Sequence, residues 1–232
     1  YTDMNAVRRD EELDNLHSVY VDQWDWEKII TDSTRNAEYL VMTVKQIVDV
    51  ICDTAEEIKN RYGIDCGISR NVKVISTQEL EDLYPDLTPK QREDEITKKF
   101  GTVFITQIGG KLRSGIRHDG RAPDYDDWNL NGDIIFYNRL LNRAFEISSM
   151  GIRVNRESLI SQLTESDCLD RLSLPFHSAL EKGELPLTMG GGIGQSRLCM
   201  LLLNKAHIGE VQCSVWDTET ELTCKNAGIE LL

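Results

Sequence analysis

Apolar residues recur at helical spacing over one long stretch near the start of the chain, residues 34–62. Positions three and four apart form a single apolar stripe, and Gly63 follows the last of them. A glycine at this place is a common helix stop, because it enters the left-handed conformation without a steric cost. We therefore predict a helix over residues 34–62. Its core-facing stripe consists of Leu40, Val44, Ile47, Val48, Ile51, Ala55 and Ile58.

Segments with β-branched and aromatic residues at alternate positions predict strands. The first two segments flank a charged stretch, residues 9–15, and predict a hairpin whose turn has no Asn-Gly or Asp-Gly signal. A later pair of segments predicts a second antiparallel hairpin. The predicted strands are Met4–Arg8, His17–Trp26, Val72–Ile75, Thr102–Gln107, Ile134–Tyr137 and Ala144–Ser148.

Polar residues that can cap a helix mark the starts of the shorter helices. Ser76 and Glu79 have the spacing of a capping box, in which each side chain bonds the backbone N–H of the other residue. The other predicted starts lie near Thr88, Asn155 and Pro175. Residues 109–128, rich in glycine and charge, are predicted to be mostly loop.

A glycine-rich segment late in the chain, Gly190–Gly194, predicts a turn that leads into a buried helix. Glycines let a backbone pass close to a ligand, and a helix N-terminus favours anions. A dinucleotide fingerprint would have its third glycine where Arg197 stands, and no early β-α-β unit precedes it, so a Rossmann site is excluded. Tight packing of helix on sheet, with Arg197 in a structural ion pair, stays open as the alternative.

The strands come in hairpins rather than alternating with helices, and this order favours an α+β fold with an antiparallel β-sheet flanked by helices. The 232 residues fit one large domain, and a hydrophobic content of 40% suffices for its core. No internal repeat or low-complexity linker interrupts the chain.

The net charge and the cysteine spacing argue against several classes of function. The formal net charge of −13 argues against a protein that wraps a nucleic acid backbone, which would need lysines and arginines against phosphates. The six cysteines form no C-x-x-C pair, so neither a zinc site nor a disulfide framework is expected. With no signal peptide and no apolar run long enough to span a bilayer, we expect a cytoplasmic protein without a membrane partner.

Two arginines change the picture when they are considered together. Taken alone, Arg8 is a solvated arginine at the end of a strand. Four features together resemble motifs 2 and 3 of class II aminoacyl-tRNA synthetases. They are an arginine that closes a strand, a polar turn, an aromatic-rich return strand and a late G-x-G-x-x-R helix. The resemblance implies that Arg8 binds the α-phosphate of ATP and Arg197 its γ-phosphate beside the adenine.

The same resemblance implies a metal site between these two motifs. Asp133 and Glu146 match the acidic pair that holds magnesium in those enzymes, with Ser149 beside them at the ATP. Taken alone, Asp133 is a turn aspartate after a glycine, and Glu146 is an exposed strand residue.

Further blocks resemble one family in particular, the aspartate–ammonia ligases, over nearly the whole chain. They are Leu16–Glu27, Ile108–Lys111, Arg121–Trp128, Glu146–Val154 and Thr188–Leu203. The family resemblance implies synthesis of L-asparagine from L-aspartate, ammonia and ATP with Mg²⁺, through a β-aspartyl adenylate, by a homodimer that binds no nucleic acid. Asp25 and Asp126 would hold the α-ammonium of aspartate, and Gln23 would lie near the reacting carbonyl.

Without the resemblance, residues 124–127 are a solvated acidic loop, and His118 is a surface loop histidine that we assign no role. Compared with the family, we expect residues 1–232 to be a single catalytic domain that lacks an N-terminal segment and a loop after Trp128. Two other functions stay open. One is the catalytic domain of a class II tRNA ligase, and the other is a non-catalytic paralogue that binds ATP or an amino acid.

Overall fold

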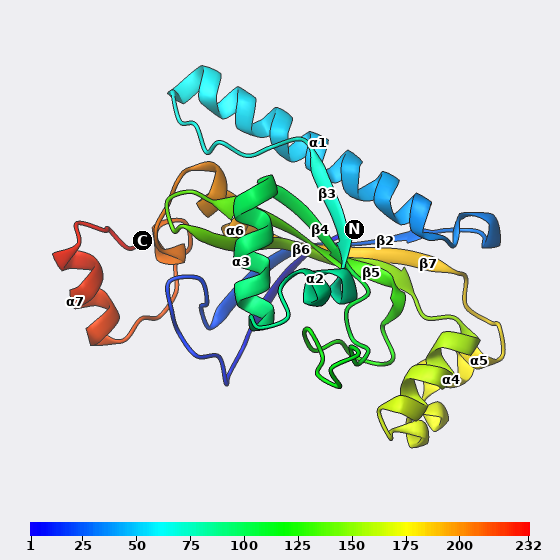
Figure 1. Ribbon diagram of the computed structural model, residues 1–232. Coiled ribbons are helices and arrows are strands. Elements are labelled where there is room, and N and C mark those ends of the chain that lie inside the picture. The colour runs from blue at the N-terminus through cyan, green and yellow to red at the C-terminus, as the bar shows by residue number, and fades with distance from the viewer.

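The computed structural model describes all residues, 1–232, and centres on one seven-stranded sheet (Figure 1). The strand order across the sheet is β1-β2-β7-β6-β5-β4-β3. The strands are β1 Thr2–Val7, β2 Tyr20–Ile29, β3 Val72–Ser76, β4 Thr102–Thr106, β5 Asp126–Asn138, β6 Arg143–Arg153 and β7 Thr188–Gly194. Every predicted strand is present, and β5 and β6 are much longer than their apolar centres indicated.

The sheet is mixed rather than purely antiparallel. All neighbouring strands are antiparallel except β3 and β4, which run parallel. The chain between these two strands forms two helices, α2 (Thr77–Leu83) and α3 (Pro89–Phe100), and such a helical crossover is what parallel neighbours require. The α+β prediction is confirmed, with this one parallel pair as the correction.

The remaining helices are α1 Ala37–Tyr62, α4 Arg156–Glu165, α5 Pro175–Glu181, α6 Gln195–Leu202 and α7 Thr218–Asn226. Short 3₁₀ turns occur at Asp32–Thr34, Leu169–Ser173 and Ile208–Glu210. The long helix α1 starts three residues later than predicted, because Asn36 caps it by accepting a hydrogen bond from the Tyr39 amide. It ends at Gly63, whose φ of 72° is the left-handed stop expected from the sequence. No helix combines the length and apolar character needed to cross a bilayer.

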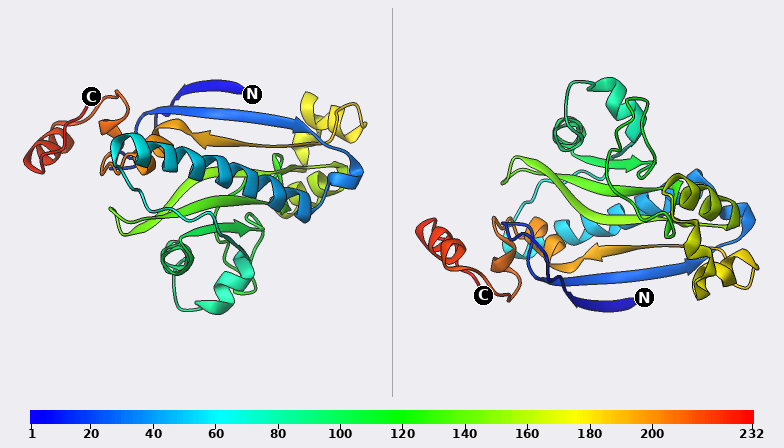
Figure 2. Two further views of the ribbon diagram at one scale, coloured as in Figure 1. Left: turned by 90° about the horizontal axis from the view of Figure 1, so that it is seen from above. Right: turned by 90° about the horizontal axis from the view of Figure 1, so that it is seen from below.

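Helices cover both faces of the sheet. On one face, α1 and α6 contribute to the main core, where Val44 and Met200 are fully buried with Phe136 and Phe145 of the central hairpin. On the other face, α2 and α3 pack over the β3–β4 side around Leu80 and a smaller core. Helices α4 and α5 form a separate pair at one end of the sheet, and α7 projects from the opposite end (Figures 1 and 2).

The predicted glycine-rich turn is wrong, because residues 188–194 form β7 between β2 and β6. The glycines allow close packing inside the sheet. A Cβ at Gly191 would lie 2.5 Å from the Cβ of Met150, and one at Gly190 would lie 2.4 Å from the carbonyl oxygen of Trp26. The buried helix predicted after the glycines is confirmed as α6.

Candidate active site

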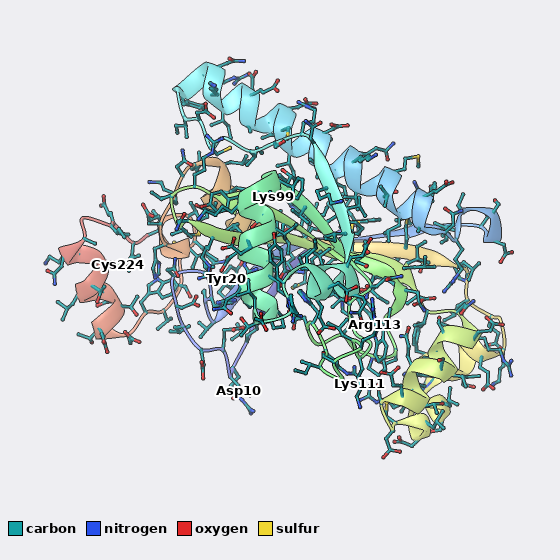
Figure 3. The ribbon with its side chains drawn as sticks, viewed as in Figure 1. Asp10, Tyr20, Lys99, Lys111, Arg113 and Cys224 are labelled. Carbon is teal, nitrogen blue, oxygen red and sulfur yellow. The ribbon has the colours of Figure 1, made fainter.

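A cavity of about 540 Å³ lies on the sheet face that the glycines of β7 leave open. It is lined by β2, β6, β7, the start of α6 and the loop that precedes β5. Figure 3 labels two residues that locate this cavity. Tyr20, at the start of β2, lines it, and Asp10 lies at the tip of the connection between β1 and β2. Seven of the eight predicted site residues line it: Arg8, Gln23, Asp25, Asp126, Glu146, Ser149 and Arg197.

The eighth residue, Asp133, stands in register with the lining residues. Asp25 of β2 pairs with Gly192 of β7, Gly192 pairs with Ser149 of β6, and Ser149 pairs with Asp133 of β5. Paired residues of neighbouring strands point to the same face. These four residues therefore form one row across the sheet, with the glycine as its open position.

A β-bulge brings Glu146 to the same face as this row. Glu146 and Ser149 are three residues apart, so an unbroken strand would point them to opposite faces. The pairing with β5 shifts by one residue between Ile134 and Ile135, so that Ile135 faces Glu146 while Asp133 faces Ser149. Both acids of the predicted metal pair thus face the cavity side from adjacent strands.

The two carboxylates of that pair are in different surroundings. Burial, and secondarily the negative charge of Asp133, raise the pKa of Glu146 to about 7, although nearby cations oppose the rise. No hydrogen bond is donated to the Glu146 carboxylate. Asp133 is buried, and its Oδ1 accepts a hydrogen bond from Arg121 while its Oδ2 stays unpaired. Oxygen atoms of both residues are therefore available to a cation.

This donor set fits magnesium better than a metal that needs a full protein cage. No group of three or more histidine, cysteine or acidic side chains is arranged to hold a metal ion. Magnesium commonly takes one or two carboxylates and completes its shell with phosphate oxygens and water. Asp133 and Glu146 meet that requirement, and their like charges favour a cation between them.

Asp126 lies at the other side of the cavity and is 3% exposed. Its carboxylate is hydrogen-bonded by Arg153, and Arg121 lies 3.8 Å away through Nε. Burial nevertheless raises the pKa of Asp126 above its ordinary value, because the two guanidinium groups offset the loss of hydration only in part. Arg153 also binds Glu27, 2.9 Å away, so its positive charge is shared.

Sequence reasoning gave Arg121 no role of its own. The guanidinium bridges Asp126 and Asp133, which links the proposed amino-acid side of the cavity to the proposed metal side. An arginine in a polar loop carries no periodicity that separates it from a solvated charge. Only its place in the block Arg121–Trp128 could have indicated it.

Arg197 points to the cavity from the first turn of α6. Its guanidinium donates to the carbonyl oxygen of Glu146 at 3.3 Å and lies 2.8 Å from Nε2 of His17. His17 is in turn 2.8 Å from Asp14 through Nδ1. Since no carboxylate pairs with Arg197, the structural ion pair considered as the alternative is absent, and the charge is available to an anion. Sequence reasoning used His17 only as a strand residue.

Arg8 follows the last residue of β1 and lies at the rim of the cavity. Its side chain is 53% exposed and pairs with Glu11 at 3.0 Å. An ion pair this exposed contributes little stability, so the guanidinium can exchange Glu11 for a phosphate at small cost.

The expectation for His118 is wrong, because its side chain is 1% exposed. Its Nε2 lies 3.1 Å from the carboxylate of Glu93 on α3, which covers this part of the loop. The ion pair of Lys90 with Glu93 and Asp119 closes the cluster from outside. A loop residue can be buried when a helix packs over it, which local sequence does not reveal.

Comparison with characterised proteins identifies close sequence relatives. The family model for aspartate-ammonia ligase matches residues 1–228. Proteins named aspartate–ammonia ligase from Clostridium perfringens strain 13 and from Lactobacillus johnsonii are each 58% identical to this chain. The alignments cover 100% of this chain and 69% and 70% of those proteins, respectively.

Solved structures with the same fold are much more distant in sequence. An asparaginyl-tRNA synthetase from Entamoeba histolytica, in complex with asparaginyl-adenylate, matches with a TM-score of 0.65 at 14% identity. The aspartyl-tRNA synthetase of the same organism matches with a TM-score of 0.62 at 19% identity. The matches cover 92% and 93% of this chain but only about half of each synthetase, 53% and 47%. This likeness establishes the class II synthetase fold. With the family model and the close relatives, we conclude that the chain belongs to the aspartate–ammonia ligase family.

Proposed function

We propose that this chain makes L-asparagine from L-aspartate and ammonia at the expense of ATP, through a β-aspartyl adenylate, with release of AMP and pyrophosphate. Membership of a family of ligases supports the proposal. The observation that carries it is the composition of one cavity, in which carboxylates suited to an ammonium group and arginines suited to phosphates line the same sheet face.

Adenylation is needed because a free carboxylate is a poor electrophile at neutral pH. In the first step, a β-carboxylate oxygen of aspartate attacks the α-phosphorus, and the bond to the pyrophosphate oxygen breaks. In the second step, the nitrogen of ammonia attacks the β-carbonyl carbon, and the carbon–oxygen bond to AMP breaks. The protein must position the reactants and offset charge, and preorganised cations contribute to both.

The roles of the two arginines follow from where they lie. Arg8 at the rim would hold the α-phosphate and the attacking carboxylate. Arg197, held by His17 on one side of its guanidinium, would bind the γ-phosphate and cover the adenine by a cation–π contact. A rigid helix start and a strand end supply the fixed geometry that a bent triphosphate requires.

Aspartate would be bound at the opposite side of the cavity. Asp25 and Asp126 are the acceptors for its α-ammonium, and Gln23 lies beside the reacting group. Gln23 Nε2 donates to Asp25 Oδ1 at 3.0 Å, which fixes the amide and the carboxylate relative to each other.

Asp133 and Glu146 would hold magnesium. When bound, the ion supplies positive charge that offsets the triphosphate during transfer. Asp133→Asn and Glu146→Gln should therefore each raise the magnesium concentration needed for half-maximal activity. Metal-independent adenylation by the wild type would refute this assignment.

A homodimer is part of the proposal, as the family resemblance implies. The outer edge of β1 is unpaired in the sheet, and Tyr1 and Val7 expose apolar side chains beside it, which supports an association there. Sedimentation equilibrium separates a species of 26.4 kDa from one of twice that mass.

An isotope experiment tests the reaction. Aspartate labelled with heavy oxygen in its β-carboxylate should transfer one label to AMP for each asparagine formed, as read by mass spectrometry. Label in inorganic phosphate together with ADP would refute the adenylate route. Unlabelled AMP without asparagine, accompanied by charged tRNA, would favour a tRNA ligase instead, because that reaction activates the α-carboxylate and leaves the β-label on aspartate.

A further inference from the structure

The side-chain amide of Gln162, on α4, is fully used by the loop that enters β5. Its Nε2 donates to the carbonyl oxygens of Pro123 at 2.9 Å and of Asp126 at 3.0 Å. Its Oε1 accepts from the backbone amide of Trp128 at 2.8 Å. Gln162 is 5% exposed and does not line the active-site cavity. One buried side chain therefore satisfies three backbone groups of a segment six residues long.

These bonds occur where the sheet cannot supply them. The pairing of β5 with β6 is interrupted between Asp126 and Asn131, where a step of five residues along β5 matches a step of only two residues along β6, from Arg153 to Gly151. Of the three bonded groups, the Trp128 amide lies inside this gap, the Asp126 carbonyl at its edge and the Pro123 carbonyl before the strand. Leaving such buried backbone groups unpaired is costly. The side-chain amide of Gln162 has the donor and acceptor of a peptide group, so it supplies the partner that each of these backbone groups needs.

A second contact holds the same loop to the same helical pair. The carboxylate of Asp124 lies 2.9 Å from Nε2 of His177 on α5, and Arg171 donates to it at 2.9 Å. Helices α4 and α5 have their own small core around Leu163, apart from the main one. Gln162 thus links helix α4 of this unit to the backbone at the start of β5.

The segment held in this way ends at a proposed aspartate ligand. Asp126 points its carboxylate to the cavity, while its carbonyl oxygen accepts from Gln162 on the other side. Moving the peptide at Asp126 would move the carboxylate by a similar amount. Strand pairing of Asp126 with Arg153, and the hydrogen bond from the Val154 amide to the Tyr125 carbonyl oxygen at 3.0 Å, hold one side of this backbone. Gln162 holds the other side, through the carbonyl oxygen of Asp126.

We infer that Gln162 is a positioning residue that sets the affinity for aspartate by fixing the backbone of the Asp126 loop; this inference rests on the proposed function. It touches no reacting group. Its removal should weaken the binding of aspartate in ground state and transition state alike, which raises the KM for aspartate and leaves kcat nearly unchanged.

Two neutral replacements test the inference. Gln162→Met keeps the length of the side chain and removes all three hydrogen bonds, whereas Gln162→Asn keeps the amide but is too short to reach all three partners. We expect the KM for aspartate to rise at least about tenfold in Gln162→Met and less in Gln162→Asn, because buried partners are left unpaired. The KM for ATP should change by less than about twofold, since Arg8 and Arg197 lie on other elements.

Leu163→Val is the matched control. It loosens the small core of the same helix, one residue along, without removing a bond to the loop. It should lower the melting temperature while the KM for aspartate stays at the wild-type value. Calorimetric titration with aspartate gives the same comparison without turnover, and it applies to any variant that melts cooperatively.

Each outcome bears on a separate claim. Wild-type protein that binds aspartate but forms no asparagine would refute the proposed function, while the titrations would still test the role of Gln162. An active wild type with an unchanged aspartate KM in Gln162→Met would overturn only the inference. An equal rise in Leu163→Val, or an equal rise in the KM for ATP, would also overturn it, because the effect would then be a general loss of structure.

Discussion

Asp25 and Asp133 lie in the same cross-strand row of the sheet, separated by Gly192 and Ser149. The row connects the proposed ammonium ligand to the proposed metal ligand across four strands. Its open position matters because a Cβ at Gly192 would lie 2.4 Å from Nε2 of Gln23 and 2.7 Å from Oδ1 of Asp25. The absence of a side chain there leaves room for the Gln23–Asp25 pair.

Gly192→Ala should therefore impair aspartate binding while the protein still folds. The added methyl group must displace the ends of two side chains, which can move, rather than backbone. We expect the KM for aspartate to rise by about tenfold or more, since misplaced ligands lose most of their hydrogen-bond energy. Initial-rate kinetics with saturating ATP measures it. Gly120→Ala is the control, because nothing lies within 4 Å of its Cβ. An unchanged KM in Gly192→Ala would contradict the placement of aspartate beside Asp25.

The raised pKa of Glu146 predicts a specific dependence of the protein's stability on pH. Its pKa rises from an ordinary value of 4.5 to about 7 in the folded protein, mainly because it is buried and secondarily because of Asp133. The folded state therefore binds more protons than the unfolded state between these two values. It follows that this group's contribution to stability falls as pH rises through that window.

Glu146→Gln removes the titration, so its effect on stability should depend on pH. Relative to wild type, the variant should gain about 3 kcal/mol of stability between pH 4.5 and pH 8. Urea denaturation at both pH values, without nucleotide or magnesium, measures the difference. Glu184→Gln, an exposed glutamate outside the cavity, serves as the control and should follow the wild type at both values. A pH-independent difference between Glu146→Gln and wild type would contradict the buried, charge-coupled state of Glu146.

The arginines at the two ends of the proposed triphosphate should matter for catalysis and not for folding. Arg8→Ala and Arg197→Ala should each lower kcat/KM by about 10²- to 10³-fold, the usual effect of removing one preorganised charge from a transition state. Arg9→Ala is a close control, because Arg9 neighbours Arg8 but pairs only with Asp10 at the surface. Normal turnover in folded Arg8→Ala and Arg197→Ala would contradict the assignment of this cavity as an ATP site of the class II synthetase type.

Local signals predicted much of the fold. The capping box at Ser76 formed as expected, and a helix starts after Thr88 as predicted, since such signals involve residues only three apart. The prediction of a turn at the glycines of β7 was wrong because glycine occurs both in turns and in tightly packed strands. Local sequence cannot distinguish these uses, because the deciding contacts come from Trp26 and Met150, far away in the chain.

The candidate site was predictable only as far as a family pattern could indicate it. The resemblance selected Asp25 and Asp126, and the structure places both at one cavity. It did not indicate that Arg121 bridges Asp126 and Asp133, or that His17 holds Arg197. These are long-range pairings of common surface residue types, so their roles depend on the folded geometry.

The state of the cysteines indicates which nitrogen source the protein uses. Deriving ammonia from glutamine usually needs a nucleophile such as a reactive thiolate. No cysteine lines the cavity. Burial raises the pKa of Cys52 to about 11, and that of Cys66, Cys199 and Cys224 above the ordinary value as well, which disfavours the thiolate.

We therefore expect this chain to form asparagine with ammonium salts and not with glutamine. The measurement compares both donors after contaminating ammonia has been removed enzymatically, with asparagine quantified by chromatography. Because free ammonia must reach the β-carbonyl of the adenylate, the rate should saturate with ammonium and should not respond to a thiol-alkylating reagent. Glutamine-driven synthesis at a comparable rate, abolished by alkylation of the cysteines, would show that one of these thiols is a nucleophile, and the assignment of free ammonia as the substrate would then be wrong.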